Sequence, residues 1–197
     1  MAGGGHDDAE RSRTRFEYRV WGEHAKAVRL LARLADEERT ETVEDCYLIV
    51  DDLSWNAKVR DDTLKVKQLV DEERGVEEWT SQHHRSASTA PTPFDEVFEA
   101  LRLDRPQRGK SFDMTKAVRR LDPDGDVRAV FVVKQRRLFR IDDLRAEATE
   151  IEIVDTDTTL HTLSIEGDDL DALRTLRKRL GLKGEPNVAV HEVIDSL

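Results

Sequence analysis

The sequence predicts an α+β protein whose strands close into an antiparallel β-barrel, with amphipathic helices packed on the outside of the barrel. Several short segments alternate charged and apolar residues, which is the two-residue period of a strand with two different faces. Other segments carry apolar residues at helical spacing, and each such helix needs an apolar surface to cover. A barrel with its apolar face outward provides that surface and turns the charged face inward.

Length, composition and charge limit what the protein can be. We expect one domain at residues 15–197, after a Gly-rich and charged leader at residues 1–14 that we expect to be disordered. No apolar run approaches the ~20 residues that cross a bilayer, and Cys46 is the sole cysteine, which excludes an internal disulfide. A cytoplasmic protein that binds no membrane is therefore expected. The net charge of -10 argues against general nucleic-acid binding.

The first half of the chain is expected to form a strand, a helix and a β-meander. Residues 15–20 alternate, with Arg15, Glu17 and Arg19 on the face opposite three apolar or aromatic side chains. Apolar residues at helical spacing predict a helix over residues 25–35. Alternation and turn residues predict four further strands, at 43–50, 55–60, 64–70 and 76–81.

The second half follows a loop at residues 83–93 that is rich in Ser, Thr and Pro. Apolar residues at helical spacing predict short helices around 94–101 and 114–121. The Asp168-Asp169 pair is suited to cap a further helix, which carries leucines on one face and ends near Gly181. Three strands are predicted in this half, at 127–139, 146–154 and 160–165.

The charged faces of these strands are the most informative feature of the sequence. Lys58 and Arg60, for example, alternate with Ala57 and Val59. For any one strand, the simpler interpretation is a half-buried sheet whose charged face meets solvent. In a closed barrel the charges point into a lumen instead, where desolvation costs several kcal/mol for each charge that lacks a counter-charge. A phosphate chain supplies that counter-charge, and Arg and Lys both suit phosphate oxygens.

The order of the charged strands resembles the CYTH, or triphosphate tunnel, family. That family opens with Glu-x-Glu-x-Lys, continues through Arg-x-Arg and Thr-x-Lys strands, and later carries Lys-x-Arg and Glu-x-Glu. The corresponding segments here are Arg15-Phe16-Glu17-Tyr18-Arg19, Lys58-Val59-Arg60, Lys65-Val66-Lys67, Lys134-Gln135-Arg136 and Glu150-Ile151-Glu152. The resemblance implies an antiparallel tunnel and relatives that include adenylate cyclases, thiamine triphosphatases, inorganic triphosphatases and RNA triphosphatases.

The resemblance also implies roles for individual residues. A triphosphate would be bound by seven basic side chains, which are Arg19, Lys58, Arg60, Lys65, Lys67, Lys134 and Arg136. Catalysis, and binding of Mg²⁺ or Mn²⁺, would fall to Glu17, Glu150 and Glu152. Such a metal polarises the attacked phosphorus and activates water.

The opening motif departs from the family pattern, because Arg15 replaces its first acid and Arg19 its lysine. We expect the Arg15 guanidinium to lie near Glu17 and the Glu150-Glu152 pair, where it weakens metal binding or substitutes for the metal. Two functions remain open. One is a phosphohydrolase, or an adenylate cyclase, acting on inorganic triphosphate, thiamine triphosphate or a nucleotide with a divalent metal. The other is a non-catalytic module that binds triphosphate or polyphosphate, which Arg15 favours.

Other candidate residues have simpler interpretations. Tryptophans at strand positions pack in cores more often than they stack on a base. A His-His pair in a polar loop without a further ligand makes a poor metal site. Acidic clusters at chain reversals are expected as turns or solvated helix ends. The residues concerned are Trp21, Trp55, Trp79, His83, His84, Asp36 to Glu38 and Asp142-Asp143.

Overall fold

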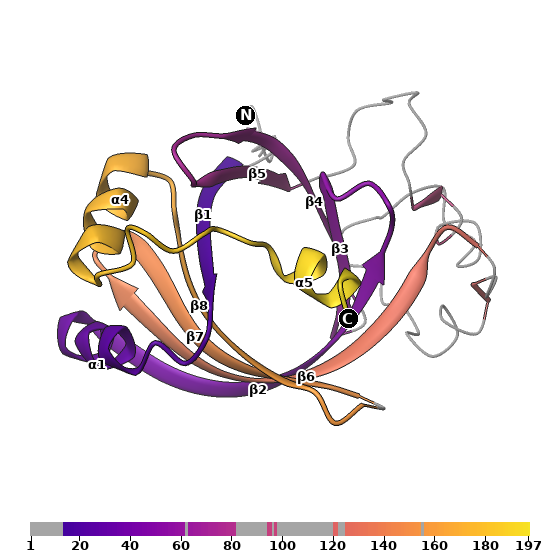
Figure 1. The fold of residues 1–197 in the computed structure, drawn as a ribbon, viewed down its shortest axis with the longest axis horizontal. Helices are drawn as coiled ribbons and strands as arrows, with labels where there is room; N and C mark the ends of the chain where they lie inside the picture. The colour runs from indigo at the N-terminus through magenta and orange to yellow at the C-terminus, as the bar shows by residue number, and fades with distance from the viewer. Residues whose placement is uncertain are drawn as a thin grey trace, which may run out of the picture.

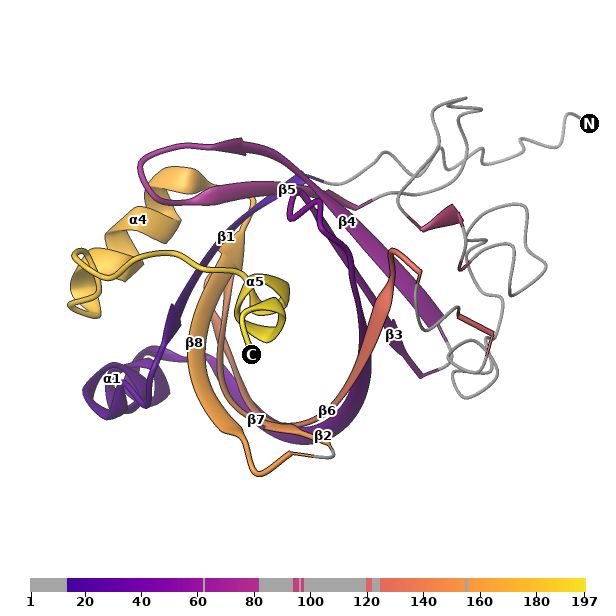
Figure 2. The same ribbon diagram turned by 45° about the vertical axis from the view of Figure 1, so that its right-hand side comes forward.

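The computed structural model describes residues 14–61, 63–81, 94, 95, 97, 120, 121, 125–154 and 156–197. Within these residues the strands are β1 (Thr14–Trp21), β2 (Glu37–Ile49), β3 (Trp55–Arg60), β4 (Thr63–Glu72), β5 (Glu77–Ser81), β6 (Arg128–Ile141), β7 (Leu144–Ile153) and β8 (Thr159–Gly167). They close into one antiparallel barrel in the order β1-β5-β4-β3-β2-β6-β7-β8, and Figure 2 shows the ring that they form. The predicted closed antiparallel barrel is confirmed.

The strands match the predicted segments, with one clear difference at the start of β2. This strand begins at Glu37, so the expectation that Asp36 to Glu38 form a turn or a helix end is wrong for the two glutamates. The reason is pairing, because β2 lies against β6 in continuous register from Glu37 opposite Arg140 to Ile49 opposite Arg128. Basic residues of β6 face the acidic start of β2, and Arg137 forms an ion pair of 2.8 Å with Glu38.

Two predicted helices, α1 (Ala25–Leu34) and α4 (Leu170–Arg179), lie outside the ring of strands (Figure 1). Their buried side chains share one core with outward-facing residues of four strands, which include Tyr18, Val20, Phe139, Ala146, Leu163 and Ile165. Asp169 caps α4 as expected, since its carboxylate accepts hydrogen bonds from the backbone N–H groups of Asp171 and Ala172. In the described part of the chain, no helix is long and apolar enough to cross a bilayer.

A second core covers the outward faces of β2, β3 and β4. It contains Cys46, Leu48, Ala57, Val59, Leu64 and Val66, packed with Phe94, Val97 and Val127. Phe94 and Val97 come from the first of the two helices expected in the middle of the chain. Most of the residues expected to form those two helices, residues 83–93 with the two histidines, and residues 1–13 lie outside the described residues.

The short helix α5 (Val190–Asp195) was not predicted, and it fills one end of the barrel. Its buried Val190 and Ile194 pack against side chains that point into the barrel, namely Tyr47, Ile49, Val132, Ile151 and Ile153. His191, also buried, lies edge-on to Trp79, with the ring centroids 5.7 Å apart. This end of the barrel is therefore apolar and closed.

Candidate functional site: a basic tunnel

The inward faces of the strands surround a cavity of about 780 Å³. Its lining contains ten lysines and arginines against five glutamates, although the whole chain is acidic. All seven basic residues predicted to bind phosphate are among them: Arg19, Lys58, Arg60, Lys65, Lys67, Lys134 and Arg136. The predicted charged lumen is thus present, and alternation on β1, β3, β4 and β6 places these side chains on one inner surface.

Asp45, on β2, organises the middle of the tunnel although its side chain is completely shielded from solvent. Arg60 donates to both of its oxygens, from Nε to Oδ1 at 2.5 Å and from Nη2 to Oδ2 at 2.7 Å, and Lys58 donates from Nζ to Oδ2 at 3.3 Å. The Lys134 Nζ lies 3.2 Å from the same carboxylate. The three cations outweigh the burial of Asp45, which would raise its pKa, and hold that pKa well below its ordinary value.

Tyr47 lies two residues further along β2 and contacts the same lysines. Its hydroxyl accepts a hydrogen bond from Lys134, and the Nζ atoms of Lys58 and Lys134 lie 5.5 Å and 4.6 Å from the centre of its ring. Burial lowers the pKa of each lysine to about 8, since the enclosed site solvates the ammonium poorly and other cations surround it. The lysines are therefore cations that a bound anion would stabilise.

Glu17 links β1 to β4 on another side of the tunnel. Its Oε1 accepts a hydrogen bond of 3.3 Å from Arg19, and its Oε2 accepts one of 3.1 Å from Lys67. Burial alone would raise the pKa of Glu17, but the two cations lower it to about 2. The Arg19 guanidinium also donates to Thr162 on β8. Glu17 is accordingly ionised and has a basic partner on each oxygen.

Arg136, on β6, bridges two carboxylates of neighbouring strands. It donates to Glu41 on β2 and to Glu147 on β7, and Thr149 donates to the second oxygen of Glu147. These contacts and nearby Arg19 overcome the effect of burial and hold the pKa of Glu147 well below its ordinary range. The tunnel wall on this side therefore also consists of paired charges.

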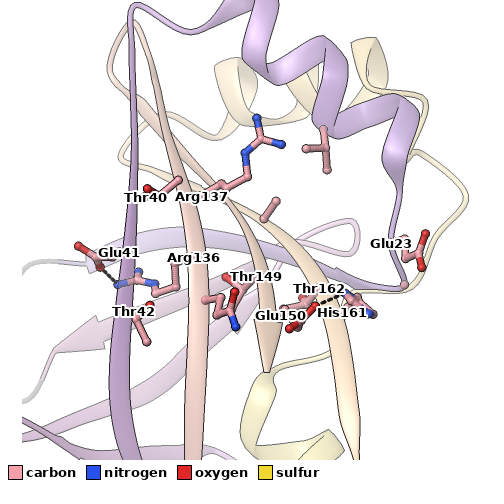
Figure 3. A pocket seen from close by; sticks show the side chains of 14 residues that line it. Glu23, Thr40, Glu41, Thr42, Arg136, Arg137, Thr149, Glu150, His161 and Thr162 are labelled. Carbon is pink, nitrogen blue, oxygen red and sulfur yellow. Dashed lines mark hydrogen bonds and ion pairs between the residues drawn. The ribbon is translucent and has the colours of Figure 1, made fainter. Parts of the chain in front are cut away.

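Glu150 and Glu152 do not face the tunnel, which corrects the placement expected for them. On β7 the side chains of Ile151 and Ile153 point inward against α5, so the two glutamates point outward and are exposed. Glu150 lies 4.0 Å from His161 on the wall of an outer groove of about 700 Å³ beside α1 (Figure 3). The acid that β7 contributes to the tunnel is Glu147.

Arg15 also differs from its expected surroundings. Its guanidinium lies 3.1 Å from Glu166 and 3.5 Å from Asp168, and not beside Glu150 and Glu152. Glu166 lies 3.6 Å from Arg145 as well, so two cations share this carboxylate. The arginine that replaces the first acid of the family motif is therefore neutralised at the edge of the tunnel.

The divalent metal implied by the family resemblance finds no matching set of ligands in the described part of the chain. Of the three predicted metal ligands, Glu17 has a cation on each oxygen and the other two lie outside the tunnel. No group of three or more His, Cys, Asp or Glu side chains within the described residues is arranged to hold a metal. Mg²⁺ and Mn²⁺ need oxygen ligands, and here these oxygens already bind lysine and arginine.

Asp45, Tyr47, Glu41, Glu147 and Glu166 complete the site and were not among the predicted site residues. Alternation offered a signal for the first two, because Asp45 and Tyr47 lie opposite the apolar face of β2 that carries Cys46 and Leu48. Glu147 was not predicted because the Glu-x-Glu pattern on β7 pointed to Glu150 and Glu152 instead.

Comparisons with known proteins concern the fold. No family model and no curated sequence matches this chain. A protein of Pyrococcus horikoshii OT3 matches 90% of this chain and 98% of its own, at 17% identity and a TM-score of 0.53. A candidate adenylate cyclase of Bacillus halodurans has 15% identity and a TM-score of 0.51, and a candidate adenylyl cyclase of Hippeastrum, described as having a dominant triphosphatase activity, has 15% and 0.52. Each of the latter two matches 92% of this chain and 95% of its own.

These structures match nearly the whole chain, and two of them are described as candidate adenylate cyclases, one of the activities implied by the motif resemblance. The predicted charged residues of four strands, β1, β3, β4 and β6, also line one lumen. The chain therefore has the closed antiparallel tunnel fold that its resemblance to the CYTH family implied.

Proposed function

We propose that the tunnel binds an anion carrying a chain of phosphates, such as inorganic triphosphate, a short polyphosphate or the triphosphate of a nucleotide or thiamine. The observation that carries this proposal is the surplus of cations in an enclosed cavity of an acidic protein. Charges buried in this way are costly unless a counter-charge meets them. A linear polyanion supplies several negative charges at short intervals.

The distribution of the cations supports a linear ligand. Arg19 comes from β1, Lys58 and Arg60 from β3, Lys65 and Lys67 from β4, and Lys134 and Arg136 from β6. Side chains from strands all around the barrel can surround a chain that lies along its axis. The arginines suit bidentate contacts with phosphate oxygens, and the lysines contribute compact charges.

Hydrolysis of the bound triphosphate is a second candidate function. The similarity in fold to the Hippeastrum protein, which is described as having a dominant triphosphatase activity, favours it. In such a reaction the tunnel cations would neutralise the charge that develops on the phosphate oxygens. A divalent metal, if one accompanies the substrate, would add charge neutralisation and activate water.

Binding is tested by thermal shift and isothermal titration calorimetry with tripolyphosphate. We expect the ligand to raise the melting temperature by mass action, and the Arg60→Ala, Lys134→Ala double variant to lose this shift. Arg136→Gln and Arg137→Gln form a matched pair, because adjacent residues of β6 point to opposite faces and Arg137 lies outside, against Glu38. Arg136→Gln should weaken binding at least tenfold, and Arg137→Gln should leave it unchanged.

A panel of tripolyphosphate, thiamine triphosphate, ATP and GTP, with Mg²⁺ or Mn²⁺, separates the two candidates by phosphate release. Release that is lost in Arg136→Gln and retained in Arg137→Gln would establish hydrolysis in the tunnel. Binding without release of phosphate or formation of a cyclic product would establish the binding module. Equal behaviour of the two variants in every assay would contradict the tunnel as the site.

A further inference from the structure

We infer that the tunnel binds its phosphate anion without a divalent metal, because the tunnel carboxylates serve as internal counter-ions for the cations. This inference rests on the proposed function and specifies how the same site meets its ligand. It departs from the metal dependence that the family resemblance implied.

The contacts of Glu17 carry the first step. Each of its oxygens accepts a hydrogen bond from a cation, Arg19 on one side and Lys67 on the other. A divalent ion bound to this carboxylate would lie within a few Å of both cations, and like charges at that distance repel strongly in a site of low polarity. Glu17 thus holds two phosphate-binding side chains in place.

The same arrangement recurs where β2, β6 and β7 lie side by side. Arg136 bonds to both Glu41 and Glu147, while Thr149 occupies the other oxygen of Glu147. Arg39 lies 3.7 Å from the second oxygen of Glu41. Deeper in the tunnel, three cations surround Asp45, whose side chain has no exposed surface through which a hydrated metal could approach.

An entering phosphate chain would exchange partners with these carboxylates. Arg19, Lys67 and Arg136, the partners of Glu17 and Glu147, keep 10%, 35% and 15% of their side-chain surface exposed, so a ligand can reach them. Asp45 is enclosed and would remain paired, positioning Lys58, Arg60 and Lys134 throughout. Mg²⁺ bound to the ligand would lower the charge that these cations recognise.

The inference is tested by calorimetric titration of the full chain with tripolyphosphate, once with EDTA and once with excess Mg²⁺. We expect binding in EDTA, and weaker binding when Mg²⁺ is present. We also expect Glu17→Gln to tighten binding in EDTA by about three- to tenfold, because one competing negative charge is lost from the site. Glu44→Gln is the matched control, since Glu44 is exposed on the outer face of β2, and its affinity should not change.

Glu147→Gln provides a second test should Glu17→Gln fail to fold, and the melting temperature of each variant without ligand reports on folding. The inference is overturned if tripolyphosphate binds only when Mg²⁺ is present, or if Glu17→Gln and Glu147→Gln weaken binding. Absence of binding with and without Mg²⁺ would instead contradict the proposed function itself. Tighter binding by the two variants in EDTA would establish the carboxylates as counter-ions.

Discussion

Asp45 and Glu77 are both buried carboxylates of the barrel, and their surroundings affect them in opposite ways. Asp45 is surrounded by three cations that keep it ionised. Glu77, on β5, receives one hydrogen bond of 2.9 Å from the Trp79 indole and lies near other acids. Burial, together with those acids, raises the pKa of Glu77 to about 7. Asp45 therefore holds three cations in place, while Glu77 destabilises the folded protein when it is ionised.

Glu77→Gln should stabilise the protein at pH 8 and have little effect at pH 5. In the folded state Glu77 keeps its proton up to about pH 7, whereas in the unfolded chain it loses the proton near 4.5. The free energy of unfolding of the parent therefore falls as the pH rises from 4.5 to 7 and stays lower above that range. A shift of this size corresponds to a gain on the order of 3 kcal/mol at pH 8.

Urea unfolding of Glu77→Gln and the parent at pH 5 and pH 8 measures this difference. Glu78→Gln is the control, because Glu78 is the next residue of β5 and points to the other face of the strand. Equal free energies of unfolding for Glu77→Gln and the parent at pH 8 would show that the ionised Glu77 carboxylate does not destabilise the folded protein.

At the level of single residues, the sequence predicted the cations of the tunnel better than its acids. The basic residues belong to Lys-x-Arg and Lys-x-Lys patterns, in which alternation alone sets a shared face. Glu150 and Glu152 show the same alternation, yet they lie on the other face. A period of two identifies which residues share a face, but it does not decide whether that face points inward.

The strand β7 shows what decides the face of such an element. Ile151 and Ile153 are buried against α5 inside the barrel, and Glu147 reaches Arg136 from the same side. Ala146, the residue directly before Glu147, faces outward, beneath the helices. The inner surface is thus charged in the tunnel and apolar at the closed end, so an apolar residue on this strand could belong to either face.

The helix α5 could not be expected from the sequence because it has only six residues. A segment of this length shows less than two turns of helical spacing, and isolated helices this short are not stable in water. Packing inside the end of the barrel is what stabilises it, and that packing depends on strands distant in the sequence.

Ile194→Ala should destabilise the protein by about 2–4 kcal/mol, because it leaves a cavity where α5 fills the barrel. Ile194 is 1% exposed, whereas Leu197, three residues later, is 64% exposed. Leu197→Ala is therefore the control and should change stability by less than about 0.5 kcal/mol. Thermal unfolding of both variants checks this, and similar melting temperatures would mean that α5 does not support the barrel.

The whole molecule has a negative net charge, whereas the lining of its tunnel is rich in basic residues. The fold class was predictable because five charged strands and the amphipathic helices agreed on one architecture. The placement of the predicted metal ligands was not predictable, because it depends on which carboxylates meet which cations across the barrel. Such contacts join residues far apart in the chain, as Arg15 and Glu166 do, and no local pattern encodes them.

Binding of tripolyphosphate should weaken as the pH rises through about 8. Lys58 and Lys134, whose pKa values are lowered to about 8 chiefly by burial, then lose the charges that attract the anion. We expect the affinity to fall roughly tenfold between pH 7 and pH 9 for each lysine that must be protonated. Calorimetric titration across this range measures the change.

Stability without ligand should follow the opposite trend over the same range. The unfolded chain holds these lysine protons up to about pH 10.5, so between pH 8 and 10.5 it binds more protons than the folded protein does. The contribution of the two lysines to the free energy of unfolding therefore rises with pH. For the binding prediction, an affinity for tripolyphosphate that stays constant from pH 7 to pH 9 would mean that neither lysine contacts the anion.

The closure of one end of the barrel by α5 limits how a ligand could reach the tunnel. Val190 and Ile194 fill one end of the barrel, so a ligand of the tunnel would enter and leave at the other end, near Glu37, Arg140 and Arg145. Under the proposed function, a phosphate chain would enter by its free terminus, and a bulky group at its other terminus would stay outside. A tunnel with this shape would bind the end of a polyphosphate and not a segment from the middle of a long polymer.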